Sequence, residues 1–482
     1  MKKTFTKALS FAMALVMLLG MCSFASAEAT VYNDVPFQNV TTDESDPNYY
    51  KDLWTAGIYN YKMVRNFPTL YEKDAWDAAQ TASNVLESMD PEALTDANKA
   101  QLVTAKEAIE ALSQHQVKPF EGINGQVLYI WGEDMPVTTE NVQDGFSLTS
   151  YDNADFRPFL VPYLVADQSQ AKGTLIILSG GGNTTRSNPN EAYKVSPAFL
   201  DLGYNCFILQ RRVEPYNNED IVMDLQRSIR YIKYHAAEWG LDLEGTLLGA
   251  AGFSGGAGNI CTLMEKFYGD ITPDQFDKDY VCDEIDAVNS DLNVAMPIYS
   301  GRVLETENPN IPHIFTAVGA DDSIGGMNGY DNCWAMFQQM REIPGNNPEV
   351  HVYAQNGHGF GAGNAGTSSM SWIPTADMYM QKVMGLSEVN YEGEIPEEYV
   401  MMQDLVIDWF PIGTTTVTAY TNADQSKVLY TFFGWGDMIM VEGILINGHV
   451  ADVTYDSVGY FKEDAPKMWE LIDPAAWVPV QR

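Results

Sequence analysis

Hydrophobic and polar positions follow three successive patterns along the chain. From residue 28 to about 116, apolar residues recur at the spacing that puts them on one face of a helix. The first face comprises Ala79, Ala82, Leu86 and Met89, and the second, beyond a break at Asp90-Pro91, comprises Leu102, Ala105, Ile109 and Leu112. Thr95 stands where a hydroxyl would cap the second helix. This pattern predicts a helical region over 28–120, for which a packing helix pair or a spacer is the simplest interpretation.

Between residues 121 and 386, continuously apolar runs alternate with helical patterns. The expected strands are Gln126–Trp131, Phe159–Val165, Thr174–Leu178, Asn205–Leu209, Thr246–Ala251, Asn293–Tyr299, Ile314–Val318 and Val350–Ala354. The clearest helix carries Ile221, Leu225, Ile229 and Ile232 on one face and ends at Trp239-Gly240. Strands that are apolar on both faces belong to sheets covered on both sides. The pattern therefore predicts an α/β domain with a mostly parallel central sheet.

Beyond residue 386 the pattern changes to the alternation of half-buried strands. The expected strands are Thr414–Thr421, Lys427–Phe433, Met438–Ile446 and His449–Tyr455. Asn447-Gly448 between the last two is a typical two-residue hairpin turn, and Pro466–Ile472 is expected to add a helix. Residues 387–482 are therefore predicted to form a small β-rich domain.

The first 27 residues have the composition of a secretory signal peptide. Lys2, Lys3 and Lys7 precede an apolar run from Ala8 to Met21, and Ala25-Ser26-Ala27 provides small residues for cleavage. We therefore expect a signal peptide over 1–27 and a secreted or cell-surface protein. No later run reaches the roughly 20 apolar residues of a membrane span.

The chain is strongly acidic, with a formal charge of −37 that becomes −40 once the three signal lysines are removed. Nucleic acids and anionic membranes are bound by basic surfaces, so neither is an expected partner. Four cysteines remain beyond the signal segment, too few for a disulfide scaffold in so long a chain. Cys206 and Cys261 stand in apolar surroundings and are expected in the core, while a bridge between Cys282 and Cys333 stays open. The pattern does not predict an oligomeric state.

A candidate nucleophile stands in Gly252-Phe253-Ser254-Gly255-Gly256, between an apolar run and a helix-compatible segment. A strand, a tight turn and a helix with serine at the apex form the nucleophile elbow of serine hydrolases. The flanking glycines remove the β-carbons that would collide in so sharp a turn. Ser254 is therefore the predicted nucleophile, and the Gly255 N–H is an expected donor to an oxyanion.

A serine nucleophile needs a base and an orienting acid. Of the six histidines, His358 alone lies in a glycine-rich loop after the last apolar strand, where it could reach over the sheet edge. Asp321 and Asp322 follow an earlier strand, in the order serine, acid, histidine that such enzymes use. Neighbouring residues leaving a strand point apart, so one of the two aspartates is expected to be the acid.

Three consecutive glycines, Gly180 to Gly182, follow the expected strand Thr174–Leu178. Their backbone N–H groups could approach a substrate where side chains would block them, which favours a role in the oxyanion hole.

These motifs together resemble those of the α/β-hydrolase esterases. The resemblance covers about residues 159–386 and rests on the motifs Ser179–Asn183, Asp224–Ile232, Gly252–Gly256, Asp283–Val288, Gly319–Asp322 and His358–Phe360, which occur in this order. The group most similar is the acetylesterase and carbohydrate-esterase branch related to hormone-sensitive lipase. The resemblance implies Ser254 as nucleophile, Asp322 rather than Asp321 as acid, His358 as base, and Gly181, Gly182 and Gly255 as N–H donors. It implies no cofactor and no metal.

One position departs from the family pattern, because Ser179 replaces the histidine that usually precedes the three glycines. The change leaves the backbone donors in place but alters the side chains behind them.

The expected function is hydrolysis of short-chain carboxylic esters through an acyl-enzyme, with O-acetyl groups on carbohydrate as substrate. The expected partner is a small-molecule or oligosaccharide ester. A feruloyl or other aryl esterase and a serine peptidase of the same fold are the alternatives, and a non-catalytic glycan-binding protein is an alternative of another class.

Overall fold

The computed structural model describes residues 37, 44–117, 122–132, 134–306, 308, 310–323, 328–343, 345–384, 399–409, 413–434 and 437–472. The expected signal peptide, residues 1–27, lies outside them. The chain divides into two compact units, Met1–Met384 and Gly385–Arg482, at a point beside the expected boundary.

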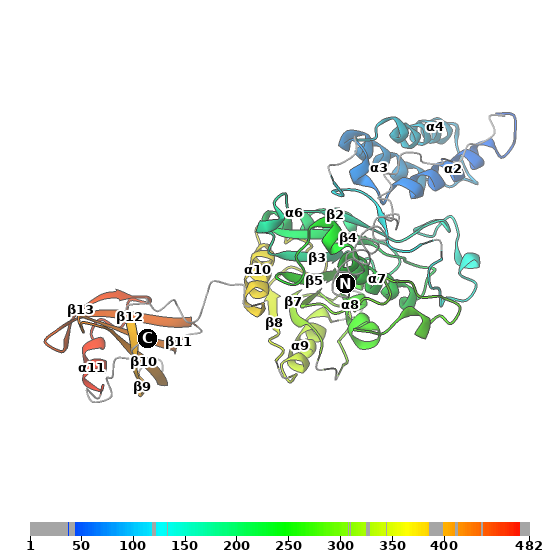
Figure 1. Cartoon of the computed structure of the whole chain (residues 1–482). Coiled ribbons are helices and arrows are strands. Elements are labelled where there is room, and N and C mark those ends of the chain that lie inside the picture. The colour runs from blue at the N-terminus through cyan, green and yellow to red at the C-terminus, as the bar shows by residue number, and fades with distance from the viewer. Residues whose placement is uncertain are drawn as a thin grey trace, which may run out of the picture. The chain divides into compact units, whose positions relative to one another are not determined.

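The larger unit is built on an eight-stranded sheet (Figure 1). In chain order its strands are β1 (Leu128–Tyr129), β2 (Phe159–Tyr163), β3 (Gly173–Leu178), β4 (Tyr204–Gln210), β5 (Leu247–Phe253), β6 (Val294–Ile298), β7 (His313–Gly319) and β8 (Glu349–Tyr353). Their order across the sheet is β1-β2-β4-β3-β5-β6-β7-β8, antiparallel at β1, β2 and β4 and parallel from β4 onward. This is the sheet of the α/β-hydrolase fold, which confirms the predicted mostly parallel α/β architecture.

The sheet is covered on both faces, as its apolar strands require. Successive residues of β3 point to opposite sides: Leu175 and Ile177 enter one apolar core, and Ile176 and Leu178 enter the other. The helices of this unit are α2 (Tyr49–Val64), α3 (Lys73–Glu87), α4 (Asp96–Glu110), α5 (Asn188–Glu191), α6 (Val195–Asp201), α7 (Asn218–Trp239), α8 (Gly255–Thr262), α9 (Gly329–Met340) and α10 (Trp372–Val383). Residues of α6 and α10 pack in the first core, and residues of α7 and α8 pack in the second.

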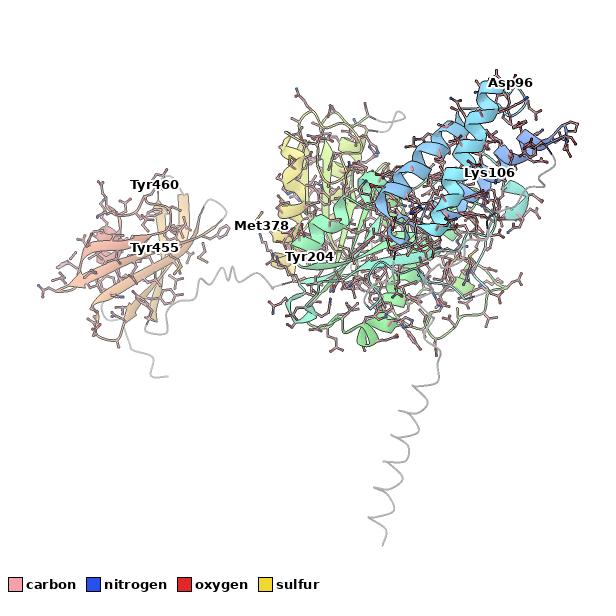
Figure 2. The ribbon with its side chains drawn as sticks, turned by 90° about the horizontal axis from the view of Figure 1, so that it is seen from above. Asp96, Lys106, Tyr204, Met378, Tyr455 and Tyr460 are labelled. Atoms are coloured by element: carbon pink, nitrogen blue, oxygen red, sulfur yellow. The ribbon has the colours of Figure 1, made fainter. Side chains whose placement is uncertain are left out.

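The predicted faces of the N-terminal helices are confirmed. All eight apolar residues named for them are buried, and the Thr95 hydroxyl accepts a hydrogen bond from the Asn98 N–H at the start of α4, the helix that carries Asp96 and Lys106 (Figure 2). These helices share a core with the sheet, since the rings of Phe67 and Phe159 stack with centroids 4.7 Å apart. The helical region is thus part of the larger unit.

The structure corrects one expectation for this unit and answers one question that the sequence left open. The first strand is shorter than expected, because just Leu128 and Tyr129 pair with β2. No disulfide forms among the described residues: Cys206, Cys261 and Cys333 are buried thiols and Cys282 is a half-buried one. No helix of the described chain has the length and apolar character to cross a bilayer.

The smaller unit is an antiparallel five-stranded sheet in the order β13-β12-β11-β10-β9. Its strands are β9 (Tyr399–Trp409), β10 (Gly413–Asn422), β11 (Lys427–Gly434), β12 (Asp437–Ile446) and β13 (His449–Asp456), and helix α11 (Ala465–Glu470) packs on them. Asn447 and Gly448 have φ values of 55° and 76°, the conformation expected of the hairpin turn. The first strand, β9, was not predicted. Tyr455 and Tyr460 are exposed on this unit (Figure 2).

Candidate active site

Ser254 occupies a strained turn between β5 and α8. Its backbone has φ 51° and ψ −112°, a conformation that residues other than glycine rarely adopt. This conformation holds Ser254 at the apex of the turn. A β-carbon on Gly252 would lie 2.5 Å from the carbonyl oxygen of Gly256, so the turn cannot close around a larger residue. The local sequence therefore forms the elbow that its glycines indicated.

His358 and Asp322 complete a hydrogen-bonded chain with Ser254. The His358 Nε2 atom lies 2.8 Å from Ser254 Oγ, and Nδ1 lies 2.9 Å from each carboxylate oxygen of Asp322. Asp322 follows β7 and is 2% exposed, and His358 stands in the loop after β8. A buried carboxylate at Nδ1 keeps that nitrogen protonated and leaves Nε2 to accept the serine proton.

The Asp321 side chain points away from the hydrogen-bonded chain of Ser254, His358 and Asp322, and it anchors the loop that carries His358. Its carboxylate accepts hydrogen bonds from the N–H groups of Gly357, at 2.8 Å, and Asn356, at 3.0 Å. The Gly357 bond is the main reason that the pKa of Asp321 lies below its usual range. Of the two aspartates left open by the residue pattern, the structure thus places Asp322 at the imidazole and gives Asp321 a supporting position.

The glycine loop after β3 lies directly against the elbow. A β-carbon on Gly255 would lie 2.8 Å from the amide nitrogen of Gly182 and 3.1 Å from that of Asn183. Among the described residues, the N–H groups of Gly181, Gly182 and Gly255 donate no hydrogen bond within the protein. Amides that are close together and have no internal acceptor are suited to receive an oxyanion.

Gly181 has to be glycine for the loop to take this shape. Its φ is 100°, and a β-carbon would lie 2.5 Å from the carbonyl oxygen of Thr185. The Gly181 carbonyl accepts hydrogen bonds from the N–H groups of Thr184 and Thr185, which closes the turn.

Glu191 and Tyr299 hold parts of the site in place, and the sequence did not predict a role for either residue. The buried Glu191 carboxylate accepts hydrogen bonds from the Gly180 N–H, at 2.6 Å, and from the Tyr299 hydroxyl, at 2.8 Å. The Tyr299 hydroxyl in turn accepts one from the Gly361 N–H, and its ring packs edge-on against His358 at 5.0 Å. Glu191 therefore ties the oxyanion loop to the histidine loop. Burial raises its pKa, although both hydrogen bonds oppose the rise.

Ser179 stands where the pattern of the resembled esterases has histidine, and its side chain is part of the same hydrogen-bonded support of the glycine loop. Its hydroxyl donates a 2.8 Å hydrogen bond to Asn188 Oδ1, and the Asn188 amide donates to Gln210. Asn188 and Glu191 are the first and last residues of the four-residue helix α5. A short helix in a polar loop gives no periodic signal, so this arrangement could not be read from the sequence.

A small open hollow of about 260 Å³ adjoins Ser254. Gly182, Asn183, Gly255 and Arg302 are among its lining residues. The Arg302 guanidinium is held by Glu265 through two hydrogen bonds of 2.8 and 2.7 Å.

Comparisons with known proteins find structural likenesses of low sequence identity. No protein-family model and no curated protein matches the chain. Among solved structures it is similar to an acetyl ester-xyloside bifunctional hydrolase from Caldicellulosiruptor lactoaceticus, with 19% identity over 55% of this chain and 97% of that one and a TM-score of 0.42.

Two further structures show a comparable likeness. One is MGS-M1, an α/β-hydrolase enzyme from a Medee basin deep-sea metagenome library, with 19% identity over 48% of this chain and 96% of that one and a TM-score of 0.38. The other is the propionate-bound thermophilic esterase Est2 of the Planctomycetes species Thermogutta terrifontis, with 19% identity over 48% and 92% of the two chains and a TM-score of 0.39. These likenesses concern the fold and assign no activity to this chain.

Proposed function

We propose that the protein is a secreted serine esterase that removes short acyl groups, above all acetyl, from carbohydrate, as the resemblance to acetylesterases implies. The observation that carries the proposal is the continuous hydrogen-bonded chain from Ser254 through His358 to Asp322, beside backbone N–H groups with no internal acceptor. A serine with an oriented base and a ready oxyanion hole is equipped for acyl transfer.

The reaction proceeds in two halves. The Ser254 oxygen attacks the ester carbonyl carbon while His358 Nε2 takes the serine proton, and the carbonyl electrons move to an oxyanion that the amides of Gly182 and Gly255 can receive. When the tetrahedral intermediate collapses, His358 gives its proton to the departing alcohol and the acyl group stays on Ser254. Water then attacks the acyl-enzyme, again with His358 as base, and releases the carboxylic acid.

The dimensions of the hollow support a short acyl group. At about 260 Å³ it is smaller than the range of roughly 300–1,000 Å³ typical of ligand pockets. A long acyl chain gains about 0.8 kcal/mol for each methylene that is buried, and this requires an apolar tunnel. An open hollow of about 260 Å³ is not such a tunnel. The charge, −37 for the full chain and −40 without the three signal lysines, also disfavours polyanionic glycans, which supports neutral acetylated sugars as substrates.

A side-by-side measurement of kcat/KM for acetyl, octanoyl and feruloyl esters tests this function. We expect acetyl to be preferred over octanoyl by about tenfold, equivalent to about 1.4 kcal/mol in the transition state. Acetylated sugars should be deacetylated, and nitroanilide peptides should not be cleaved. A preference for octanoyl would contradict the argument from the hollow, a preference for feruloyl would contradict the acetyl assignment, and peptide cleavage would indicate a peptidase.

A further inference from the structure

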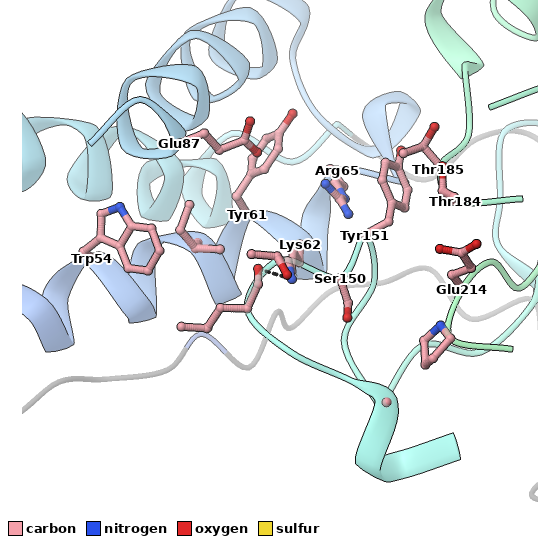
Figure 3. Close-up of a pocket in the computed structure, with 15 residues that line it drawn as sticks. Trp54, Tyr61, Lys62, Arg65, Glu87, Ser150, Tyr151, Thr184, Thr185 and Glu214 are labelled. Atoms are coloured by element: carbon pink, nitrogen blue, oxygen red, sulfur yellow. Dashed lines mark hydrogen bonds between the residues drawn. The ribbon is translucent and has the colours of Figure 1, made fainter. Parts of the chain in front are cut away.

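A second, larger cavity lies beside the candidate active site. It has a volume of about 910 Å³ and is formed where α2 faces the loop 145–151 and the turn at Thr184 and Thr185 (Figure 3). Trp54 and Tyr61 of α2 line one side, and Thr184 and Glu214 line the other. The N-terminal helical region therefore supplies a wall of this cavity.

The cavity and the hollow at Ser254 are separated by a single turn. Gly182 and Asn183 line the hollow, and the next two residues, Thr184 and Thr185, line the cavity. The Glu214 N–H donates a 2.8 Å hydrogen bond to the Asn183 carbonyl, which fastens the cavity wall to the same turn. Because consecutive residues of one turn line the two spaces, a ligand with its ester at Ser254 could extend past this turn toward the cavity.

The volumes of the hollow at Ser254 and of the cavity indicate which part of a ligand each could hold. The hollow holds about 260 Å³ and the cavity about 910 Å³, which is near the upper end of ordinary ligand pockets. A substrate with a small acyl group and a large alcohol would place its acyl group at Ser254 and its bulk in the cavity.

The cavity wall suits a polar ligand that has an apolar face. The Trp54 indole offers a ring of the amphipathic kind that packs on flat ligands, and Thr149, Ser150, Thr184 and Thr185 offer hydroxyls. An alkyl chain offers these hydroxyls no hydrogen-bond partner, so a fatty acyl chain is disfavoured here.

Two cationic side chains at the end of α2, Lys62 and Arg65, also line the cavity. Lys62 Nζ donates to the carbonyls of Leu148, at 2.7 Å, and Ser147, at 3.3 Å, and the Arg65 guanidinium lies over the Tyr151 ring with Cζ 3.5 Å from its centroid. Within the described residues, neither cation is paired with a carboxylate. Cationic side chains that face no carboxylate suit a ligand rich in oxygen atoms.

We propose that this cavity binds the sugar units adjoining the one that carries the ester, so that the helical region serves as a saccharide-binding wall of the active site. This inference rests on the proposed function, because the ester must lie at Ser254 for its neighbours to reach the cavity. It assigns a role to α2 beyond packing, and it makes oligosaccharide esters better substrates than esters of single sugars.

The kinetic test compares acetylated xylotetraose with 4-nitrophenyl acetate in three variants. Trp54→Ala removes the ring, and Leu148→Ala truncates a lining side chain that is 43% exposed and thus safe for folding. Each should lower the ratio of kcat/KM for the tetrasaccharide to that for the nitrophenyl ester by roughly three- to tenfold, the range of an aromatic or apolar contact. Trp334→Ala, at a tryptophan on α9 that is 40% exposed, is the matched control and should leave the ratio unchanged. An unchanged ratio in both cavity variants would overturn the proposal.

A binding test separates this proposal from the esterase proposal. Unacetylated xylotetraose, cellotetraose and mannotetraose are titrated calorimetrically into the Ser254→Ala protein and into the same protein carrying Trp54→Ala or Leu148→Ala as well. At least one tetrasaccharide should bind to the first protein and bind more weakly to both others. If none binds at millimolar concentration, the saccharide assignment is wrong even if esters are hydrolysed. Binding without any ester hydrolysis would support the cavity and contradict the esterase.

Discussion

Replacing Glu191 tests whether the oxyanion loop is held in place by a buried charge. The carboxylate accepts from the Gly180 N–H and from the Tyr299 hydroxyl, and these donors belong to two different loops of the site. Hydrogen bonds to charged groups contribute about 1.5–3 kcal/mol and neutral ones about 0.5–1.5 kcal/mol. In Glu191→Gln the amide oxygen can keep the Gly180 bond, and the loss of charge should cost about 1–1.5 kcal/mol. If that loss falls on the transition state, kcat drops by about tenfold.

A graded series makes this prediction sharper. Glu191→Ala leaves both donors buried without an acceptor, at about 1–3 kcal/mol each, so kcat should fall by about a hundredfold or more. Tyr299→Phe keeps the Gly180 bond and should cost least.

Steady-state hydrolysis of 4-nitrophenyl acetate measures kcat and KM, and circular dichroism checks that each variant is folded. Because the oxyanion forms in the transition state, we expect kcat to change and KM to stay near its wild-type value. Wild-type kcat in folded Glu191→Ala would refute the reasoning, and so would a loss confined to KM.

Three further changes probe neighbouring parts of the site. Asp322→Asn should reduce kcat by roughly four orders of magnitude, because an amide cannot stabilise the imidazolium. Asp321→Asn should lower kcat far less, because an amide oxygen can still accept hydrogen bonds from the N–H groups of Gly357 and Asn356. The reverse ranking in kcat would contradict this assignment. Gly181→Ala should yield a folded protein with at least tenfold lower kcat, since a β-carbon would collide with the Thr185 carbonyl in a backbone with φ 100°; an unchanged kcat would show that the loop tolerates the side chain. Burial raises the pKa of Glu191, so the folded protein binds more protons than the unfolded one between the ordinary glutamate pKa of about 4.3 and the raised value. The stability that Glu191 contributes is therefore lost as the pH rises through that window. Urea unfolding at pH 4 and pH 7 should therefore show Glu191→Gln gaining stability relative to wild type at the higher pH, and a constant difference would contradict it.

The local parts of the site could be predicted from the sequence, and the long-range parts could not. The elbow at Ser254 is encoded within five residues, because the turn requires its glycines and the flanking patterns supply strand and helix. Asp321 and Asp322 are adjacent, and deciding between them on physical grounds needs the direction in which each side chain leaves β7. Glu191 lies 11 residues from Gly180 and 108 from Tyr299, so no local pattern relates them.

The fold shows the same division. Where the strands of the main sheet are apolar, as in β3 and β6, their patterns place them closely, whereas β9 was missed. Its pairing with β10 shifts register, since Ala419 faces Gln403 while Tyr420 faces Met401, which leaves Met402 as an extra residue. A bulge of this kind breaks the alternation of period two by which a half-buried strand is recognised. The cavity beside α2 also depends on how distant segments pack, which no single stretch of sequence contains.

The most direct test of the account is turnover of 4-nitrophenyl acetate by the wild-type protein and by Ser254→Ala. Removing the serine oxygen takes away the nucleophile and leaves the oxyanion donors and the binding surfaces in place. We predict a folded variant with kcat/KM reduced by at least about a thousandfold, and mass spectrometry of the quenched wild-type reaction should find an acetyl group on Ser254. Normal turnover by folded Ser254→Ala would remove this residue from the mechanism and contradict the account.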